Sequence, residues 1–262
     1  MSRTIPQKVA IKLANLTGAL QKDFVRRKPP HPLHTWGKEA SNREAAKRPF
    51  RTDVINFLLG NYSRPTTYLE IGVRNPADNF THIKAHRKVS VDPGIEFKDN
   101  PVDFPLTSDK FFSRLDSGAI LPEINLFDVI FVDGLHLAEQ VDRDINNALR
   151  YLAEDGFLVL HDCNPPTEWH ARERFDYHGS PAIDAWNGTT WKAFQTRRFD
   201  AQLFTCCIDT DWGVGVISKS CNIGNNIAPV NPFFEYAELE RNRTAHLNLV
   251  SFDHFKKLVK GS

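Results

Sequence analysis

The chain has 262 residues, 41% of them hydrophobic, and a formal net charge of only +1, so it can bury a large core as one α/β domain. No window approaches the ~20 apolar residues that span a bilayer, and no basic start leads into an apolar run; this excludes a membrane span and predicts a soluble, cytoplasmic protein. The cysteines (Cys163, Cys206, Cys207 and Cys221) lack Cys-x-x-Cys spacing and the density of a disulfide-stapled secreted fold. We expect reduced thiols.

The small net charge hides an uneven distribution. Residues 1–51 hold twelve Lys and Arg against three Asp and Glu, which makes this segment +9 and the remainder −8. A basic segment can attract nucleic acid, an anionic substrate or an acidic patch on its own domain. Because Pro29, Pro30 and Pro32 interrupt the segment and few aromatic residues are interleaved, we expect a solvated basic helix followed by a loop.

From Thr66 onward the chain alternates between strand-like and helix-like segments. Residues 53–59 predict a short helix that ends at Gly60, and residues 67–73 predict a buried strand. Residues 77–86 can form a helix, after which residues 88–92 predict a second strand that ends in an acid. Strand, helix and strand in about 25 residues make a βαβ unit.

The same alternation continues through the middle of the chain. A crossing segment lies near residues 108–115, and residues 127–133 form a strongly apolar strand. Apolar residues then recur at helical spacing from Leu137 and predict an amphipathic helix that Gly156 ends, followed by a buried strand over 157–162. This alternation predicts a parallel sheet with helices on both faces.

After Asp162 the pattern becomes a long loop, which inside a compact domain is usually functional. Its aromatic side chains can wall a substrate pocket or pack against the N-terminal segment; they are Trp169, Tyr177, Trp186 and Trp191. Residues 187–191 predict a turn and an N-capped helix that continues to residue 199. Residues 202–208 and 213–218 predict an antiparallel hairpin, and Ser251 is a predicted N-cap of a closing helix.

Polar residues stand where the first two predicted strands end. Glu70 and Gly72 close the first strand, where a doubly wound fold turns sharply and a ligand lies across the crevice, and Gly72 lets the backbone approach that ligand closely. Asp92 follows twenty residues after Gly72, a position from which a carboxylate accepts hydrogen bonds from ribose hydroxyls. The pattern favours a nucleoside site over a structural turn and a capped strand end.

Several segments resemble the motifs of class I S-adenosylmethionine-dependent methyltransferases. Tyr-Leu-Glu-Ile-Gly-Val at 68–73 is similar to motif I, Ser-Val-Asp-Pro at 90–93 to the acidic motif II, and residues 107–112 to the segment that lines the adenine. Residues 127–136 resemble motif IV, and residues 160–166 resemble the segment after strand five. Their Asp-Gly-Leu-His and His-Asp-Cys-Asn-Pro sequences are similar to one subgroup of small-molecule and sugar O-methyltransferases.

The resemblance covers about residues 66–218 and implies an architecture. It implies a doubly wound α/β fold with a seven-stranded, mostly parallel, Rossmann-like sheet, one antiparallel strand, and helical additions at both ends. The methyltransferase domain would span residues 52–220, after a basic N-terminal arm of residues 1–51. Residues 221–262 would form a C-terminal helical extension packed on the same domain.

The resemblance also implies S-adenosylmethionine as the cofactor, with Glu70 near the methionine amino group or the ribose, Asp92 on the ribose and Asp109 near the adenine. The usual Gly-x-Gly is missing after the first strand, so we expect a wider cofactor loop with side-chain contacts from Arg74 or Asn79. A dinucleotide is disfavoured, because a pyrophosphate needs a tight glycine turn. The predicted cofactor-binding residues are Glu70, Gly72, Val73, Arg74, Asn79, Asp92, Ser108, Asp109 and Asp133.

Two acids end consecutive predicted strands and suggest a mechanism. Asp133 and Asp162 should be neighbours, ~4.8 Å apart in the sheet, so their carboxylates converge and repel unless they are protonated, solvated or bridged by a cation. With the amide of Asn164 they form a predicted site for Mg²⁺ or another divalent cation. Catechol O-methyltransferase-like enzymes are similar in this respect, and their metal lowers the pKa of the substrate hydroxyl.

The rival mechanism uses a histidine as general base, because imidazole titrates near neutrality. His136 follows Asp133 at the predicted sheet edge, where a base is needed, whereas His161 lies inside a strand and is more typical of a packed core histidine. The predicted catalytic residues are His136, Asp133 and His161.

These patterns together predict an enzyme that methylates a small molecule or sugar, most often at oxygen, with a small-molecule acceptor as its partner and with neither a membrane nor a nucleic acid. A homo-oligomer is left open. The alternatives are a nucleic-acid methyltransferase that uses the basic arm, a Rossmann-like oxidoreductase, and a non-catalytic binding protein that kept the fold. No Asn-Pro-Pro-Tyr-type base pocket follows the 127–133 strand, which disfavours the first.

Overall fold

The computed structural model describes residues 31–96, 99–124, 126–177 and 179–261. The greater part of the expected basic N-terminal helix therefore falls on residues 1–30, outside the described residues. The described part of the N-terminal segment opens with α2 (Pro32–Ala46), whose first position is a proline. Proline fits there because the first backbone N–H groups of a helix have no partner inside it. In the part of the chain that is described, no helix is both long and apolar enough to cross a bilayer.

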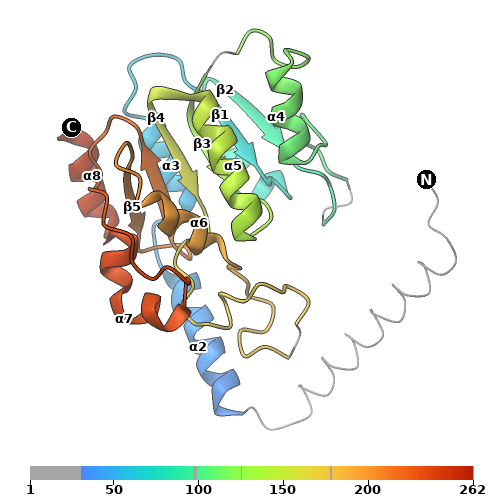
Figure 1. Cartoon of the computed structure of the whole chain (residues 1–262). Helices are drawn as coiled ribbons and strands as arrows, with labels where there is room; N and C mark the ends of the chain where they lie inside the picture. Colours follow the sequence, from blue (N-terminus) through green and yellow to red (C-terminus); the bar gives the residue numbers. More distant parts are fainter. Residues whose placement is uncertain (1–30, 97–98, 125, 178, 262) are drawn as a thin grey trace, which may run out of the picture.

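A seven-stranded sheet runs through the described residues in the order β2-β1-β3-β4-β6-β5-β7 (Figure 1). Its strands are β1 (Thr67–Ile71), β2 (Arg87–Val91), β3 (Phe127–Val132), β4 (Leu152–Leu160), β5 (Phe204–Ile208), β6 (Val214–Ser218) and β7 (Leu249–Val250). Only β6 runs antiparallel to its neighbours, while the other strand pairs are parallel. The predicted mostly parallel sheet with one antiparallel strand is confirmed.

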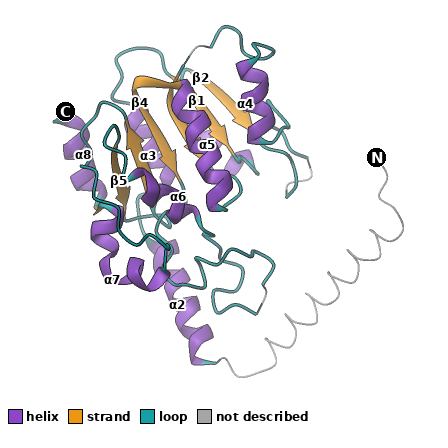
Figure 2. Ribbon diagram, viewed as in Figure 1, coloured by secondary structure: helices purple, strands orange, loops and turns teal. Residues whose placement is uncertain are grey.

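Helices cover both faces of the sheet (Figure 2). One face packs against α4 (Ser108–Asp116), α5 (Ala138–Tyr151), α6 (Thr190–Arg197) and α7 (Tyr236–Leu247). The opposite face packs against α3 (Arg51–Leu59) and α8 (Phe252–Lys260). Alternate residues of one strand serve the two faces: Ile130 and Val132 point to the first and Val129 and Phe131 to the second. This two-sided burial explains why the central strands are mostly apolar.

Several predicted elements are confirmed. The closing helix α8 begins where Ser251 accepts a hydrogen bond from the backbone N–H of His254, and β5 and β6 form the expected hairpin. Asp133 directly follows β3 and Asp162 lies two residues beyond β4, and these strands are parallel neighbours. The carboxyl ends of β1 to β4 therefore lie at one edge of the sheet.

Two local predictions were wrong. The helix expected over 77–86 is a pair of 3₁₀ turns, Pro76–Asp78 and Phe80–His82, because Asn79 leaves the helical region (φ −151°) and turns its side chain into the interior. Gly156 does not end α5: the helix stops at Tyr151, and Leu152 already pairs with Phe127 of β3. Gly156 lies instead in an irregular stretch of β4, where an added Cβ would lie 2.9 Å from the Asp128 carbonyl oxygen.

Two elements inside the predicted C-terminal extension of residues 221–262 were not located individually from the sequence. Helix α7 and the two-residue strand β7 follow one another near the C-terminus, and β7 adds an edge to the sheet beside β5. Helix α7 lacks a clear apolar stripe in its sequence, and a strand of two residues is too short to produce an alternating pattern.

Candidate active site

A cleft of about 600 Å³ opens at the carboxyl ends of β1 to β4. All nine predicted cofactor-binding residues line it: Glu70, Gly72, Val73, Arg74, Asn79, Asp92, Ser108, Asp109 and Asp133. His136, His161 and Asp162 line it as well. The topology thus gathers side chains from four strand ends around one space, although they are separated by more than ninety residues in the sequence. Asn164 is not among the lining residues.

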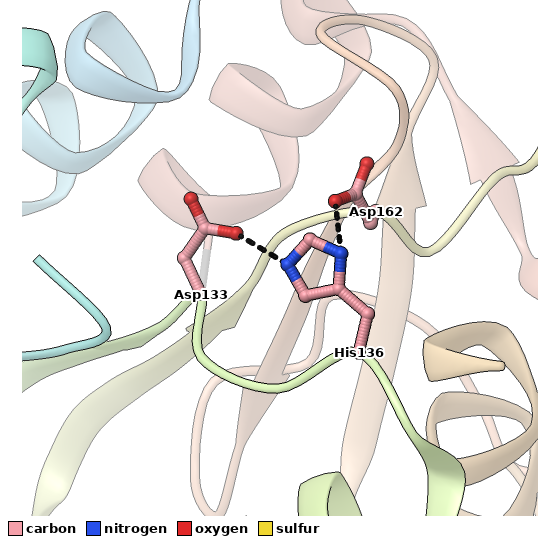
Figure 3. Close-up of side chains that lie close together, drawn as sticks. All are labelled: Asp133, His136 and Asp162. Carbon is pink, nitrogen blue, oxygen red and sulfur yellow. Dashed lines mark ion pairs between the residues drawn. The ribbon is translucent and has the colours of Figure 1, made fainter. Parts of the chain in front are cut away.

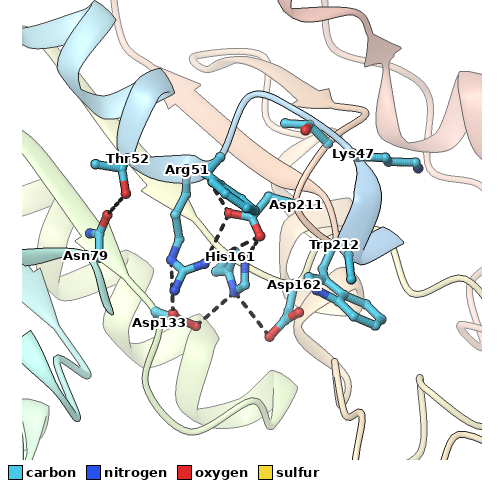
Figure 4. Close-up of polar contacts among 12 residues, drawn as sticks. Lys47, Arg51, Thr52, Asn79, Asp133, His161, Asp162, Asp211 and Trp212 are labelled. Carbon is cyan, nitrogen blue, oxygen red and sulfur yellow. Dashed lines mark hydrogen bonds and ion pairs between the residues drawn. The ribbon is translucent and has the colours of Figure 1, made fainter. Parts of the chain in front are cut away.

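Glu70 is the most buried carboxylate at the β1 end, with 2% of its surface exposed. Its Oε2 accepts hydrogen bonds from the Tyr68 hydroxyl (2.6 Å) and from Asn79 Nδ2 (2.9 Å), and Asn79 in turn accepts from the Thr52 hydroxyl (2.6 Å; Figure 4). Burial raises the pKa of Glu70 to about 7 against the opposing effect of these hydrogen bonds. The carboxyl group is therefore held rigidly and titrates near neutral pH.

The turn after β1 and the end of β2 meet at Asp92. Its two carboxylate oxygens accept hydrogen bonds from the backbone N–H groups of Arg74 (2.8 Å) and Gly94 (2.7 Å). Gly72, which lies between Glu70 and Arg74, has φ +86°, and a Cβ there would lie 2.2 Å from the Asp133 carbonyl oxygen. The backbone of this turn therefore passes directly against the end of β3, in a conformation that favours glycine.

A third group of polar side chains lies where α4 begins. Gln140 of α5 donates from Nε2 to Ser108 Oγ, Asp109 Oδ1 and Asp144 Oδ1 at 3.0 to 3.2 Å. Asp144, which was not predicted, is 1% exposed and lines the cleft. Burial raises its pKa to about 6. Asp109 therefore belongs to a network that also includes a buried carboxyl group of α5.

The centre of the cleft holds an acid–histidine cluster, which we define as Asp133, His136, His161, Asp162 and Asp211. His136 lies between two carboxylates, with Nε2 at 3.3 Å from Asp133 and Nδ1 at 3.1 Å from Asp162 (Figure 3). His161 Nδ1 faces the same two acids at 3.2 and 3.4 Å. One potential ligand atom from each of Asp133, His136 and Asp162 lies within 4.8 Å of the others.

Arg51 and Asp211 complete this arrangement from distant parts of the chain (Figure 4). Arg51, the first residue of α3, lies 3.1 Å from Asp211 and 3.8 Å from Asp133. Its backbone N–H also donates to Asp211 (2.8 Å). Asp211 Oδ1 lies 3.5 Å from His161 Nε2. Three carboxylates and a guanidinium group thus surround the two imidazoles.

The charges around the imidazoles shift their pKa values strongly. Burial alone would lower the pKa of His136, but Asp162 and Asp133 outweigh it and raise the pKa to about 9. His161 behaves alike: its burial is outweighed by Asp133 and Asp162, and its pKa is raised well above the usual value. The three acids and one arginine leave a net negative charge, which protons on the imidazoles balance and which a bound cation would balance equally.

Asn164 lies outside the cluster. Its carboxamide oxygen accepts a hydrogen bond from Arg243 (2.6 Å) and its Nδ2 donates to Asp209 (3.2 Å). Both ends of the amide are therefore used in a network that ties the segment after β4 to α7. The structure brings Asp133 and Asp162 together as predicted, but His136 stands beside them in the place expected for Asn164.

The segment Trp186–Thr189, at the end of the long loop, holds the acid–histidine cluster from outside. Asn187 Nδ2 donates to Asp162 Oδ1 (2.8 Å), and the Thr189 backbone N–H donates to the His136 carbonyl (2.8 Å). The Trp186 ring stacks on the His136 ring with centroids 5.2 Å apart. Gly188 has φ +61°, and a Cβ there would lie 2.0 Å from the His136 carbonyl oxygen.

The helix predicted after the 187–191 turn is present as α6, but it lacks the expected side-chain N-cap. Thr189 occupies the capping position. Its side chain makes no capping hydrogen bond to α6, and its hydroxyl oxygen instead accepts from the backbone N–H of Ala138 (2.7 Å), the first residue of α5. The hydroxyl thus satisfies a free N–H of the helix that follows His136. Thr189, at the end of the long loop, therefore holds the segment that connects Asp133 to α5.

Four residues of the site were missed from sequence: Arg51, Asp144, Asn187 and Asp211. Asp211 carries the clearest sequence signal, because it lies in the Asp-Thr-Asp-Trp turn of the predicted hairpin, beside an aromatic residue. Arg51 is a basic residue at the start of a helix, and Asn187 was interpreted only as part of a turn. No local pattern indicates that Asn187 will pair with Asp162, 25 positions away. Nor does one indicate that Arg51 will pair with Asp211, 160 positions away.

Comparison with known proteins adds the following findings. A family model described as a methyltransferase domain matches residues 31–163, just over half of the chain. The chain is similar to an O-methyltransferase from Bacillus cereus in complex with SAH, with 12% identity, a TM-score of 0.42, and coverage of 75% of this chain and 94% of that one. An SAH-bound methyltransferase from Podospora anserina is 14% identical, with a TM-score of 0.42 and coverage of 84% and 99%.

A third similar structure is the MycE methyltransferase of the mycinamycin biosynthetic pathway, in complex with Mg, SAH and mycinamycin VI. It is 15% identical, with a TM-score of 0.43, over 83% of this chain and 60% of that chain. The comparison with curated proteins found no match.

Proposed function

Because the chain belongs to the methyltransferase domain family, we propose that it transfers the methyl group of S-adenosylmethionine to a hydroxyl oxygen of a small molecule. The observation that carries the proposal is the shared cleft at the carboxyl ends of four strands. Glu70, Asp92 and Asp109 line its cofactor end, and the acid–histidine cluster lies beside them. Carboxylates at these places suit ribose hydroxyls, a primary amine and a positively charged sulfonium.

We propose that the acid–histidine cluster binds a divalent cation through Asp133, His136 and Asp162. One oxygen or nitrogen of each side chain lies within 4.8 Å of the other two. This spacing supports the fit, because ligand atoms ~2.1 Å from one metal ion lie ~3 to 4 Å from one another. Two carboxylates and an imidazole suit Mg²⁺, Mn²⁺ or a similar ion. When bound, such a cation lowers the pKa of an acceptor hydroxyl.

The protein's own groups would then orient the reaction. Glu70, Asp92 and Asp109 hold the cofactor, and most of the rate enhancement comes from placing the methyl group in line with the acceptor oxygen. We assign His161 to take the acceptor's proton on Nδ1, which lines the cleft beside Asp133 and Asp162. These two acids hold the pKa of His161 above its usual value, and a bound cation would compensate their charge and free the ring to act as a base. Asp211, at 3.5 Å from Nε2, would orient the ring and stabilise the imidazolium.

The rival mechanism, with His136 as the base and no cation, is less well supported. Both ring nitrogens of His136 are engaged, Nε2 by Asp133 (3.3 Å) and Nδ1 by Asp162 (3.1 Å), and Nδ1 also lies 3.1 Å from the Trp186 carbonyl. A base needs an uncharged nitrogen, and with no cation to compensate Asp162 and Asp133 the pKa of His136 is about 9, so its ring carries a proton at neutral pH. We therefore assign His136 to holding the cation.

The function is tested with the full chain, methyl-deuterated S-adenosylmethionine, Mg²⁺ and a metabolite extract. We expect mass spectrometry to find an acceptor that gains one labelled methyl group, and NMR of the product to place it on oxygen. A chelator should stop the reaction and added Mg²⁺ or Mn²⁺ should restore it, whereas a histidine-only mechanism predicts a chelator-resistant rate that His136→Ala abolishes. Calorimetry that detects no binding of S-adenosylmethionine would contradict the whole proposal.

Binding of S-adenosylhomocysteine is expected to tighten about tenfold between pH 6 and pH 8. The pKa of Glu70 is about 7 in the free protein, and a nearby amine or ribose hydroxyl favours its ionised form. Below pH 7 the ligand must therefore displace a proton from Glu70, which weakens binding. Above pH 7 the carboxylate is already ionised, so this cost disappears. Calorimetric titrations of wild type, Glu70→Gln and Glu139→Gln across this range test the expectation. Glu70→Gln should flatten the profile, and the exposed Glu139→Gln should retain it; a profile unchanged in Glu70→Gln contradicts the assignment.

Asn187→Ala is expected to lower kcat about 10- to 100-fold, the usual effect of removing a residue that orients a metal ligand. The reason is loss of the 2.8 Å hydrogen bond to Asp162. Mn²⁺ affinity, followed by electron paramagnetic resonance, should fall with kcat, whereas S-adenosylhomocysteine affinity should stay within about twofold. The matched control is Asn146→Ala, which removes a similar Asn–Asp hydrogen bond from the surface of α5; equal effects of both variants would exclude a positioning role.

A further inference from the structure

The cleft is strongly acidic along its whole length. Nine carboxylate side chains line it, against two guanidinium groups, Arg51 and Arg74, among the described lining residues. Even with both imidazoles protonated, a divalent cation and a cofactor with one positive charge would leave the formal sum negative. The negative electrostatic potential of these side chains is strengthened inside a cleft, because the surrounding protein has a lower dielectric constant than water. An anion that enters this space is therefore repelled.

Both arginines of the cleft already pair with carboxylates. Arg51 lies between Asp211 (3.1 Å) and Asp133 (3.8 Å), and Arg74 forms an ion pair with Asp78. To bind a phosphate or carboxylate, either side chain would have to leave its own carboxylate and expose that charge. The described walls of the cleft thus hold more carboxylates than cationic groups, and each cationic group already faces a carboxylate.

Apolar side chains lie beside the acid–histidine cluster, where an acceptor has to bind. Trp186 stacks on His136 with the two rings inclined by only 22°, and its Nε1 donates to the Arg172 carbonyl (2.7 Å), which fixes the indole. Phe175 contacts Trp186 with ring centroids 5.3 Å apart. Leu135 lies in the loop between Asp133 and His136 and also lines the cleft.

Two of these apolar side chains are left largely in solvent. Phe175 is 54% exposed and Leu135 is 52% exposed, although both border a cavity. Single exposed apolar residues are ordinary, but a group of them at the mouth of a pocket marks a binding surface. Rings present flat apolar faces that pack on aromatic side chains. The mouth of the cleft therefore suits a ring rather than a long polar chain.

We propose that the acceptor is an uncharged or cationic hydroxyl compound with a ring whose apolar face packs against Trp186 and Phe175, and that phosphorylated and carboxylated acceptors are rejected. This inference rests on the proposed function and specifies its substrate class. A cationic group is tolerated because the acidic walls and the aromatic faces both favour positive charge. The same field disfavours the nucleic acid backbone at this site.

The charge preference is tested with three matched probes that share a dihydroxyphenyl ring. These are 4-methylcatechol, which is neutral, dopamine, which is a cation, and 3,4-dihydroxybenzoate, which is an anion. Calorimetry measures their binding to the full chain saturated with S-adenosylhomocysteine and Mg²⁺. We expect the neutral and cationic probes to bind at least about tenfold more tightly than the anion, because an added like charge in a partly buried cleft costs about that much.

The aromatic surface is tested by a pair of substitutions in one loop. Phe175→Ala should weaken the neutral probe about three- to tenfold, whereas Tyr177→Ala, which removes an equally exposed ring (55%) that does not line the cleft, should leave it unchanged. Both are surface substitutions that the fold should tolerate, and S-adenosylhomocysteine affinity should stay within about twofold in each.

The outcomes separate this inference from the proposed function. Equal or tighter binding of the anion overturns the charge preference, equal effects of the two substitutions overturn the aromatic surface, and failure of all three probes to bind at millimolar concentration overturns both. Failure of S-adenosylhomocysteine itself to bind instead contradicts the proposed function.

Discussion

Asp162→Asn is expected to lower kcat about a thousandfold and to abolish binding of the divalent cation. A metal ion that polarises an oxygen contributes several kcal/mol to transition-state stabilisation, and about 4 kcal/mol corresponds to three orders of magnitude in rate. Asparagine suits the position because Asp162 has φ +60°, a region that asparagine tolerates well. Its amide oxygen can still accept the hydrogen bond from Asn187. The backbone and the hydrogen bond should therefore survive while the charge is lost.

The measurements are steady-state kinetics, Mn²⁺ binding and S-adenosylhomocysteine binding on the same preparation. Cofactor affinity should stay within about threefold, because Asp162 belongs to the cation end of the cleft. Asp116→Asn, which neutralises an acid paired with Arg150 on the surface of α4, is the control and should match wild type. Normal cation binding in an inactive Asp162→Asn would show that the acid acts in another way.

The central sheet could be predicted because the physics of its strands is local. Phe127–Val132 is buried at every position, so its sequence is apolar except for Asp128, and its helix partner α5 shows a strong apolar stripe. Parallel strands joined by right-handed crossovers place their carboxyl ends together. The position of Glu70, Asp92, Asp133 and Asp162 at one edge follows from these rules.

The remaining part of the site could not be predicted because its contacts are not local. Arg51 and Asp211 are 160 positions apart and meet only because α3 begins beside the β5–β6 hairpin. The same holds for Asn187 and Asp162, which are joined by an irregular loop. No periodic pattern encodes such a pair, since each partner alone resembles an ordinary polar surface residue.

Asn79 and Asn164 show how tertiary contacts override a local pattern. The segment around Asn79 has the composition of a helix, but hydrogen bonds to Glu70 and from Thr52 hold that residue in a backbone conformation outside the helical region. Asn164 follows Asp162 closely enough to suggest a shared ligand, yet Arg243 of α7 holds its amide oxygen. Helix α7 was itself not predicted, so this competing partner was invisible in the sequence.

Gly72→Ala is expected to destabilise the protein by about 3–5 kcal/mol, the range of severe single substitutions. A Cβ at Gly72 would lie 2.2 Å from the Asp133 carbonyl oxygen and 2.6 Å from the Gly134 Cα. Both are backbone atoms, so neither can move without shifting the end of β3. The φ of +86° adds a conformational cost of about 1–2 kcal/mol for any residue with a side chain. Urea unfolding measures the loss.

Gly118→Ala separates these two contributions. Gly118 also has positive φ (+67°), but a Cβ there would meet no atom within 4 Å, so only the conformational cost of about 1–2 kcal/mol applies. Equal destabilisation by the two substitutions would mean that the close approach at Gly72 is unimportant. If Gly72→Ala folds at low temperature, it should bind both S-adenosylhomocysteine and Mn²⁺ more weakly, because the turn after β1 and the loop that carries Asp133 and His136 share this one backbone contact.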